Sequence, residues 1–170
     1  MDFESYIRDI EDFPKKGITF KDITPLLNDT EALYSASIAL CDFVCDEKID
    51  KVVGVDSRGF IFAPLMALWL KAGFVPVRKK GKLPFTTISE SFELEYGTDI
   101  LEIHMDAIQK GEKVLVHDDV LATGGTAKAV CNLVEKLGGE VVQCNFLIQL
   151  TFLNGAEKLN GYDIKALLNY

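Results

Sequence analysis

The stretch "KVLVHDDVLATGGTAKAV", residues 113–130, decides the fold, because it joins a strand pattern to a helix pattern through a loop of small residues. The apolar and β-branched residues before Asp118 predict a buried strand, and a helical pattern begins after Thr126. Outward-facing backbone N–H groups and the helix dipole at such a junction favour an anion in the loop. The adjacent carboxylates Asp118 and Asp119 call for hydroxyl donors or a divalent metal beside that anion. A sugar phosphate fits both features.

Length and charge narrow the class of protein. The chain has 170 residues, 48% of them hydrophobic, and we expect a single domain over residues 1–170. The longest apolar run, residues 59–73, contains Pro64 and Lys71, so it is not expected to span a membrane. The net charge of -8 argues against a nucleic-acid polymer as partner. The acidic N-terminus lacks the charged-then-apolar order of a signal peptide, and we expect the protein in the cytoplasm.

Cysteine and histidine give no sign of a metal or nucleophilic site. The four cysteines show no CxxC spacing, so we expect reduced, buried thiols that pack as small hydrophobic side chains. His104 lies on a predicted strand and His117 precedes the two acids. We expect structural roles for both imidazoles.

Strand and helix patterns alternate, which predicts an α/β fold with a central, mostly parallel sheet flanked by helices. Strands are predicted at 51–55, 74–77, 100–104, 113–117 and 140–150, and "DIKALLNY", 163–170, closes the chain. Helices are predicted at 29–48, 60–72 and 126–137. Residues 84–98 are polar and mixed, which is typical of an exposed hairpin or a flexible lid loop.

Three polar loops each follow a predicted strand. They are "DSRG" (56–59), the basic "RKKGKLP" (78–84) and "DDVLATGGT" (118–126). Ligands of open α/β sheets bind outside the carboxyl ends of the strands. We therefore expect these loops to meet in one crevice.

The glycine loop admits several interpretations. It has neither the G-x-x-x-x-G-K-[ST] spacing of a Walker loop nor the G-x-G-x-x-G of a dinucleotide site. Gly124 and Gly125 alone could form a tight strand-to-helix turn that needs no ligand. The preceding acids favour a ligand, because two neighbouring carboxylates repel unless donors or a cation hold them.

The segment "VLVHDDVLATGGT" (114–126) closely resembles the phosphoribosyl diphosphate binding motif of type I phosphoribosyltransferases. Four further blocks, in the same order and at fitting intervals, resemble the adenine phosphoribosyltransferases of that family. They are "DFPKKGITFKDITPLL" (12–27), "GVDSRGFIFA" (54–63), "VRKKGKLP" (77–84) and "LEYGTDILEIH" (94–104). The resemblance covers essentially the whole chain.

The resemblance implies an enzyme that transfers 5-phosphoribosyl from phosphoribosyl diphosphate to adenine, giving AMP and diphosphate. It implies magnesium carried mainly by the bound diphosphate and ribose rather than by protein ligands. It also implies a homodimer, a small N-terminal hood over residues 1–28 and a lid loop over residues 84–98.

The same resemblance assigns roles to residues. Asp118 and Asp119 would hold the ribose hydroxyls, Arg58 would meet the diphosphate and Glu95 would assist at the purine. A strained, cis peptide is implied near Asp56–Ser57. The 5-phosphate would bind Ala122, Thr123, Gly124, Gly125 and Thr126; Arg78, Lys79 and Lys82 would add positive charge; and the other substrate contacts would be Ile18, Thr19, Phe20, Lys21, Ser57 and Tyr96.

Some alternatives remain open on sequence grounds. A related transferase for hypoxanthine, guanine or orotate would share the sugar motif, and a non-catalytic regulator could keep the fold to sense phosphoribosyl diphosphate. Phe20 either stacks on the purine or only seals its loop onto the core. Lys21, Phe92 and His117 depart from the residues usual in the family.

Overall fold

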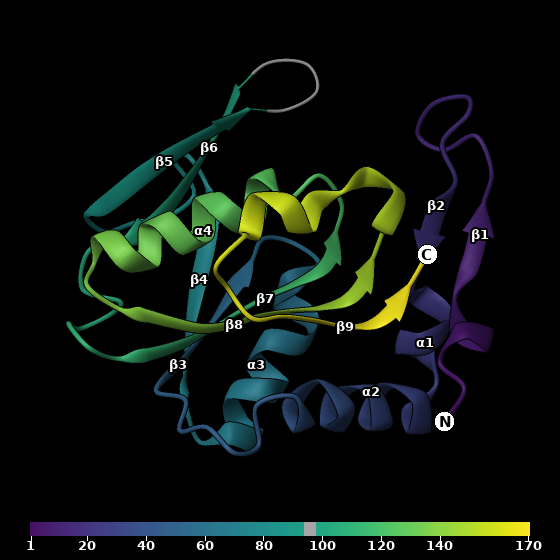
Figure 1. The fold of residues 1–170 in the computed structure, drawn as a ribbon, viewed down its shortest axis with the longest axis horizontal. Helices are drawn as coiled ribbons and strands as arrows, with labels where there is room; N and C mark the ends of the chain where they lie inside the picture. Colours follow the sequence, from purple (N-terminus) through teal and green to yellow (C-terminus); the bar gives the residue numbers. More distant parts are fainter. Residues whose placement is uncertain (94–97) are drawn as a thin grey trace.

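The computed structural model describes residues 1–93 and 98–170 (Figure 1). Its centre is a seven-stranded sheet in the order β5-β6-β4-β3-β7-β8-β9. Five strands run parallel: β3 (Lys51–Val55), β4 (Gly73–Lys79), β7 (Lys113–Leu121), β8 (Glu140–Gln149) and β9 (Ile164–Asn169). The strands β5 (Thr87–Glu93) and β6 (Thr98–His104) form an antiparallel hairpin at one edge. The predicted α/β fold with a mostly parallel sheet is confirmed.

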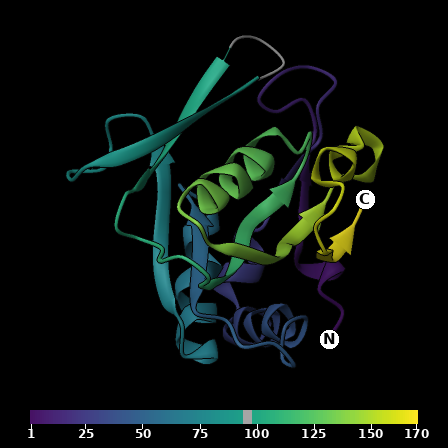
Figure 2. The same cartoon turned by 60° about the vertical axis from the view of Figure 1, so that its left-hand side comes forward.

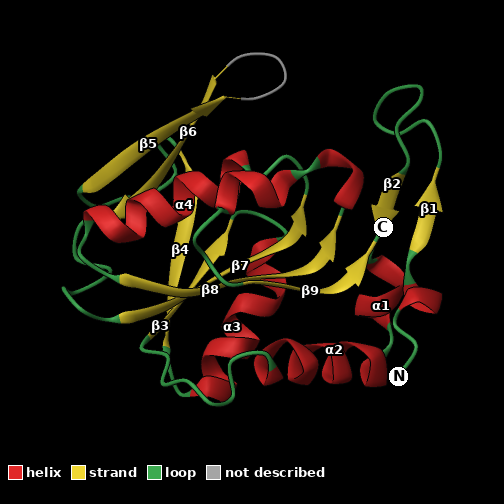
Figure 3. Ribbon diagram, viewed as in Figure 1, coloured by secondary structure: helices red, strands yellow, loops and turns green. Residues whose placement is uncertain are grey.

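Helices cover both faces of this sheet (Figures 1 and 3). On one face lie α4 (Gly125–Lys136) and the 3-10 turns η2 (Thr151–Leu153) and η3 (Gly155–Leu159); on the other lie α1 (Thr24–Asn28), α2 (Thr30–Asp42) and α3 (Gly59–Leu70). Each face has its own hydrophobic cluster, one containing Val130 and Phe146, the other Leu40 and Phe62. Figure 2 shows α4 lying across the sheet and the β5–β6 hairpin projecting beyond it.

The first 28 residues, which we call the hood, carry the small 3-10 turn η1 (Glu4–Tyr6) and their own sheet. In it β1 (Arg8–Ile10) pairs antiparallel with β2 (Phe20–Asp22) and shares no strand with the large sheet. The sequence favoured a loop over residues 17–23, which is wrong for Phe20–Asp22. Strands of three residues are too short to show a hydrophobic period.

Three further expectations need correction, and the structure shows one of the two forms expected within residues 84–98. The helix predicted at 29–48 ends at Asp42, and residues 43–46 continue in turns. The strand predicted at 113–117 continues to Leu121, so both acids lie within β7 rather than after it. Residues 84–98 were expected to form either an exposed hairpin or a flexible lid loop. Residues 87–93 are strand β5 of the hairpin. Cys45 is exposed, while the other three thiols are free and buried as expected.

Over residues 1–93 and 98–170, none of the helices has the length and hydropathy needed to cross a bilayer.

Candidate active site

The three polar loops meet, as expected, at the carboxyl ends of β3, β4 and β7. A cavity of about 290 Å³ opens there, lined by Val55, Asp56, Ser57, Arg58, Lys79, Phe92, Asp99, Leu101, Asp118, Asp119 and Thr126. A smaller hollow of about 70 Å³ lies inside the glycine loop and is lined by Asp118 and Val120–Ala127. Asp118 and Thr126 line both, so the two hollows form one continuous site.

The acid pair stands at the centre of this site. Asp118 Oδ1 accepts a hydrogen bond of 2.9 Å from the N–H of Asp119, and Arg58 forms an ion pair of 2.6 Å with Asp119 Oδ2. Burial raises the pKa of Asp118 well above its usual range, and the charge of Asp119 adds to the effect. Burial also raises the pKa of Asp119, although Arg58 opposes the change. A ligand that supplies hydroxyl donors or a cation would therefore favour ionised carboxylates here.

Glycine makes room for the pair and for the loop. A Cβ atom at Gly59 would lie 2.9 Å from Asp118 Oδ1. Gly124 is left-handed, with φ of 77°, and any Cβ there would overlap the carbonyl of Gly155. Because α4 begins at Gly125, the N–H groups of its first turn face the smaller hollow. The backbone therefore forms a cradle of the size and polarity that a phosphate needs.

The basic loop is held by Asp56. Arg78 Nε and Lys82 Nζ lie 3.0 Å and 3.5 Å from Asp56 Oδ2. Burial disfavours ionisation of Asp56, but these two cations outweigh it and lower its pKa. Lys79 instead reaches Asp99 of β6 at 2.7 Å. The peptide between Asp56 and Ser57 is cis, as the family resemblance implied.

Arg58 joins the hood to the acid pair. Besides contacting Asp119, its guanidinium donates to the carbonyl of Lys21 at 3.3 Å and lies 4.9 Å from the ring centre of Phe20. Phe20 also meets Phe13 edge-on at 5.3 Å. A planar ligand beside Phe20 would thus be close to both Arg58 and the acids.

Other hood residues are placed differently. The Lys21 ammonium pairs with Asp9 at 2.7 Å and lies 3.7 Å above the ring centre of Tyr170, so the structure does not bring it to the acid pair. The N–H of Ile18 donates to the carbonyl of Lys15, and its own carbonyl accepts from the N–H of Phe13. One lone pair of that carbonyl remains for a ligand.

The assignments to Glu95 and Tyr96 lie outside the described residues. Several residues of the site were missed from sequence: Asp56, Gly59, Phe92, Asp99 and Gly155. Asp56 and Gly59 belong to the quoted "DSRG" loop, but no role at the site was predicted for either side chain. The approach of Gly155 to the glycine loop is a contact between distant segments, and no local pattern signals it.

The side chains of the site indicate how a metal ion could be held there. Within the described part of the chain, no three His, Cys, Asp or Glu side chains gather into a metal-binding group. Magnesium is usually held by one or two carboxylates, several waters and substrate phosphates rather than by an all-protein cage. The acid pair beside a phosphate cradle fits a magnesium ion that arrives with a diphosphate.

Known proteins share this chain's sequence and fold. The phosphoribosyl transferase domain family matches residues 10–163. The adenine phosphoribosyltransferase of Flavobacterium johnsoniae is 65% identical over 170 residues, 100% of each chain. The crystal structure of the enzyme from Thermoanaerobacter pseudethanolicus has a TM-score of 0.97 at 51% identity and covers 99% of this chain and 98% of that one.

A second solved structure comes from a more distant organism. It is the adenine phosphoribosyltransferase of Saccharomyces cerevisiae in complex with adenine and D-2,5-dideoxy-2,5-imino-altritol 1,6-bisphosphate, with a TM-score of 0.92 at 40% identity and coverage of 98% and 97% of the two chains. Sequence and fold agree over the full length, so this chain belongs to the adenine phosphoribosyltransferase family.

Proposed function

We infer that this protein catalyses the reaction for which its family is named. It transfers the 5-phosphoribosyl group from phosphoribosyl diphosphate to adenine and releases AMP and diphosphate. The observation that carries this inference is the position of Asp118, which lines both a phosphate-sized hollow and the larger cavity that Asp119 also lines.

The sugar phosphate is bound at the β7–α4 junction. The backbone N–H groups and hydroxyls of Ala122–Thr126 hold the 5-phosphate, which the cradle around Gly124 supports. Asp118 and Asp119 accept hydrogen bonds from the ribose 2- and 3-hydroxyls. Charged acceptors buried this way make strong, directional bonds.

The diphosphate is bound on the other side of the cavity. Ser57, Arg58 and Lys79 line that wall, and Arg78 and Lys82 stand behind it at Asp56. Magnesium, carried by the diphosphate and ribose, supplies charge neutralisation for the leaving group. The four cations among these residues are paired with carboxylates in the structure, so diphosphate binding exchanges one set of anions for another.

Adenine is placed against Phe20. Its ring stacks there, backbone groups near Ile18 and Thr19 read its 6-amino edge, and Glu95 and Tyr96 complete the purine side. Breaking the anomeric C–O bond before the new C–N bond has formed leaves positive charge on ribose, so the chain's task is to hold both reactants in line and neutralise the departing charge.

We also propose a homodimer, located in the cytoplasm, that associates through α2 and α3. Leu68 and Trp69 are 79% and 56% exposed, and an apolar groove of about 290 Å³ runs beside them between Tyr34 and Leu65. Contiguous apolar surface of this kind marks an interface. Sedimentation should report a dimer for the wild type and a monomer for Leu68→Glu with Trp69→Glu; a monomeric wild type contradicts the proposal.

One assay tests the reaction. Purified protein with adenine, phosphoribosyl diphosphate and magnesium should form AMP, while hypoxanthine, guanine and orotate should give little product. Comparable turnover of another base would move the assignment to a different base, and binding of phosphoribosyl diphosphate without any turnover would mark a regulator.

A further inference from the structure

The β5–β6 hairpin packs on the helix that follows the phosphate loop, and one acidic side chain, Glu90, adds polar contacts there. Glu90 lies on β5, where Ile88, Glu90 and Phe92 alternate with the exposed Ser89 and Ser91. Ile88 and Phe92 pack against the hydrophobic cluster of the α4 face. Glu90 is therefore a carboxylate between two apolar residues on the inward face of a strand.

Both oxygens of Glu90 are satisfied by α4. Oε1 accepts a 2.8 Å hydrogen bond from Asn132 Nδ2, and Oε2 pairs with the ammonium of Lys136 one helical turn further on. Only 18% of the Glu90 side chain is exposed. Hydrogen bonds from Lys136 and Asn132 lower its pKa, so the carboxylate is ionised at neutral pH. This two-point contact fixes the register of β5 against α4, because a shifted strand would leave the charge unpaired.

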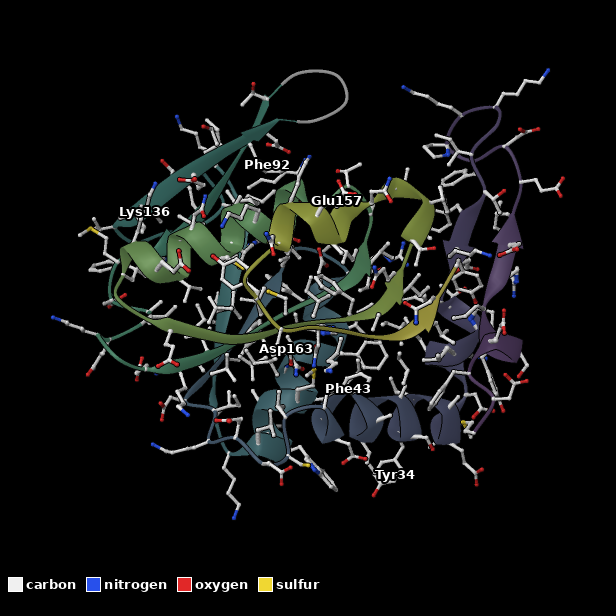
Figure 4. The ribbon with its side chains drawn as sticks, viewed as in Figure 1. Tyr34, Phe43, Phe92, Lys136, Glu157 and Asp163 are labelled. Carbon is white, nitrogen blue, oxygen red and sulfur yellow. The ribbon has the colours of Figure 1, made fainter. Side chains whose placement is uncertain are left out.

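Phe92 is the residue that this register positions. Its side chain lines the cavity of the acid pair and also a second hollow of about 300 Å³ beside α4, which is lined by Glu90, Ser91, Gly125, Lys128, Ala129, Asn132 and Lys158. Figure 4 shows Phe92 on the side of the hairpin that faces α4 and Lys136 at the far end of that helix. Phe92 is thus the partition between a solvent-facing hollow and the reaction cavity. Its cross-strand neighbour is Asp99, which holds Lys79.

We propose that Glu90 is a positioning residue that, through Asn132 and Lys136, keeps Phe92 in place as a barrier to water at the reacting ribose. The proposal rests on the function proposed above. When adenine is the acceptor, its ring nitrogen bonds to the anomeric carbon as the C–O bond breaks, the electron pair leaves with diphosphate, and the N–H proton of the ring passes to solvent. When water enters, its oxygen bonds to that carbon, the electron pair leaves with diphosphate, and a proton passes to solvent, giving ribose 5-phosphate.

The test measures how often the ribosyl group is transferred to water rather than to adenine. Ribose 5-phosphate and AMP are both quantified with adenine and phosphoribosyl diphosphate present, and their ratio is compared for wild type, Glu90→Ala, Glu90→Gln and Lys136→Met. We expect Glu90→Ala to raise the ratio about tenfold, the order of a lost charged hydrogen bond, and Glu90→Gln to raise it less because the Asn132 contact survives. Exchanging the charges, Glu90→Lys with Lys136→Glu, should bring the ratio back toward wild type.

A matched control separates positioning from stability. Glu47 forms a 2.8 Å ion pair with Lys113 at the start of β7, the end of that strand opposite the acids, so Glu47→Ala should change the denaturation midpoint and not the ratio. Equal ratios in the Glu47 and Glu90 variants would overturn the proposal. Should Glu90→Ala fail to fold, Glu90→Gln and the charge exchange decide alone. A wild type that forms no AMP would instead refute the proposed function.

Discussion

The sugar-phosphate end and the hood are built in different ways. The sugar-phosphate end, residues 117–126 with Gly59 and Gly155, is built around the end of β7, an interior strand of the sheet, where Asp119 is 6% exposed and His117 is fully buried. In the hood, Phe13 and Ile18 are 51% and 44% exposed, and the only sheet has two strands. With the roles proposed above, the sugar phosphate is recognised by residues of the core and the base by more exposed residues of the hood. Substitutions should accordingly cost more at the sugar-phosphate end.

The largest effect is expected from the acid pair. Asp118→Asn and Asp119→Asn each remove a charged acceptor, so kcat/KM should fall roughly tenfold to hundredfold for each, with the double variant lowest. Steady-state kinetics with both substrates measures this. Full activity in the double variant would show that the two acids do not bind the substrate. Unchanged kinetics with altered stability would give them a purely structural role.

The sugar-phosphate end should also make the stability of the protein depend on pH, through the buried imidazole of His117. Burial lowers the pKa of His117 to about 4, while the unfolded chain keeps the ordinary 6.5. The unfolded state therefore binds the proton more readily, so stability is full above about pH 6.5 and falls as pH drops toward 4, by about 3 kcal/mol in total.

Urea unfolding of wild type and His117→Val across that range isolates this contribution. The raised pKa values of the two acids act in the opposite direction and are common to both proteins. The stability of the variant should be less sensitive to acid than that of the wild type. Parallel curves would show that His117 does not titrate as its burial requires.

A pair of glycines sharpens the comparison. Gly124 and Gly17 both have positive φ, 77° and 86°, but a Cβ at Gly17 would meet nothing within 4 Å, whereas one at Gly124 would overlap Gly155. Alanine should cost both sites about 1 kcal/mol of backbone strain, and Gly124→Ala about 1–3 kcal/mol more through overpacking. Thermal unfolding and the KM for phosphoribosyl diphosphate measure this difference between the two variants. Equal losses of stability at both sites would show that the contact of Gly124 with Gly155 adds no cost.

In the hood the expected effect is confined to one substrate, the base. Phe20→Ala should weaken adenine binding by about 1–3 kcal/mol, the scale of base–aromatic stacking, and leave the KM for phosphoribosyl diphosphate unchanged. Preference for adenine over hypoxanthine should persist, since main-chain groups discriminate the 6-position. Normal adenine affinity in this variant would leave Phe20 as a residue that only seals the hood.

The sugar-phosphate end and the hood also differ in how far their structure could be predicted from the sequence. The β7–α4 junction was predictable, because a buried strand, two acids and a glycine turn are all local patterns, and its loops meet through a general property of α/β sheets. The hood strands were not, because three-residue strands carry no period. Contacts between distant segments, such as Gly155 on the glycine loop or Glu90 on α4, depend on tertiary packing that no window of sequence contains.

The separate sheet of the hood has a consequence for engineering. The strands β1 and β2 share no backbone hydrogen bonds with the seven-stranded sheet, although Ile7 and Ile23 on either side of the hairpin pack with the core. Residues 9–22 themselves contact the body of the protein through side chains such as Arg58 and Tyr170. Variant libraries confined to residues 9–22 could therefore be screened for enzymes that accept new bases. The site proposed for phosphoribosyl diphosphate would stay unchanged in every variant.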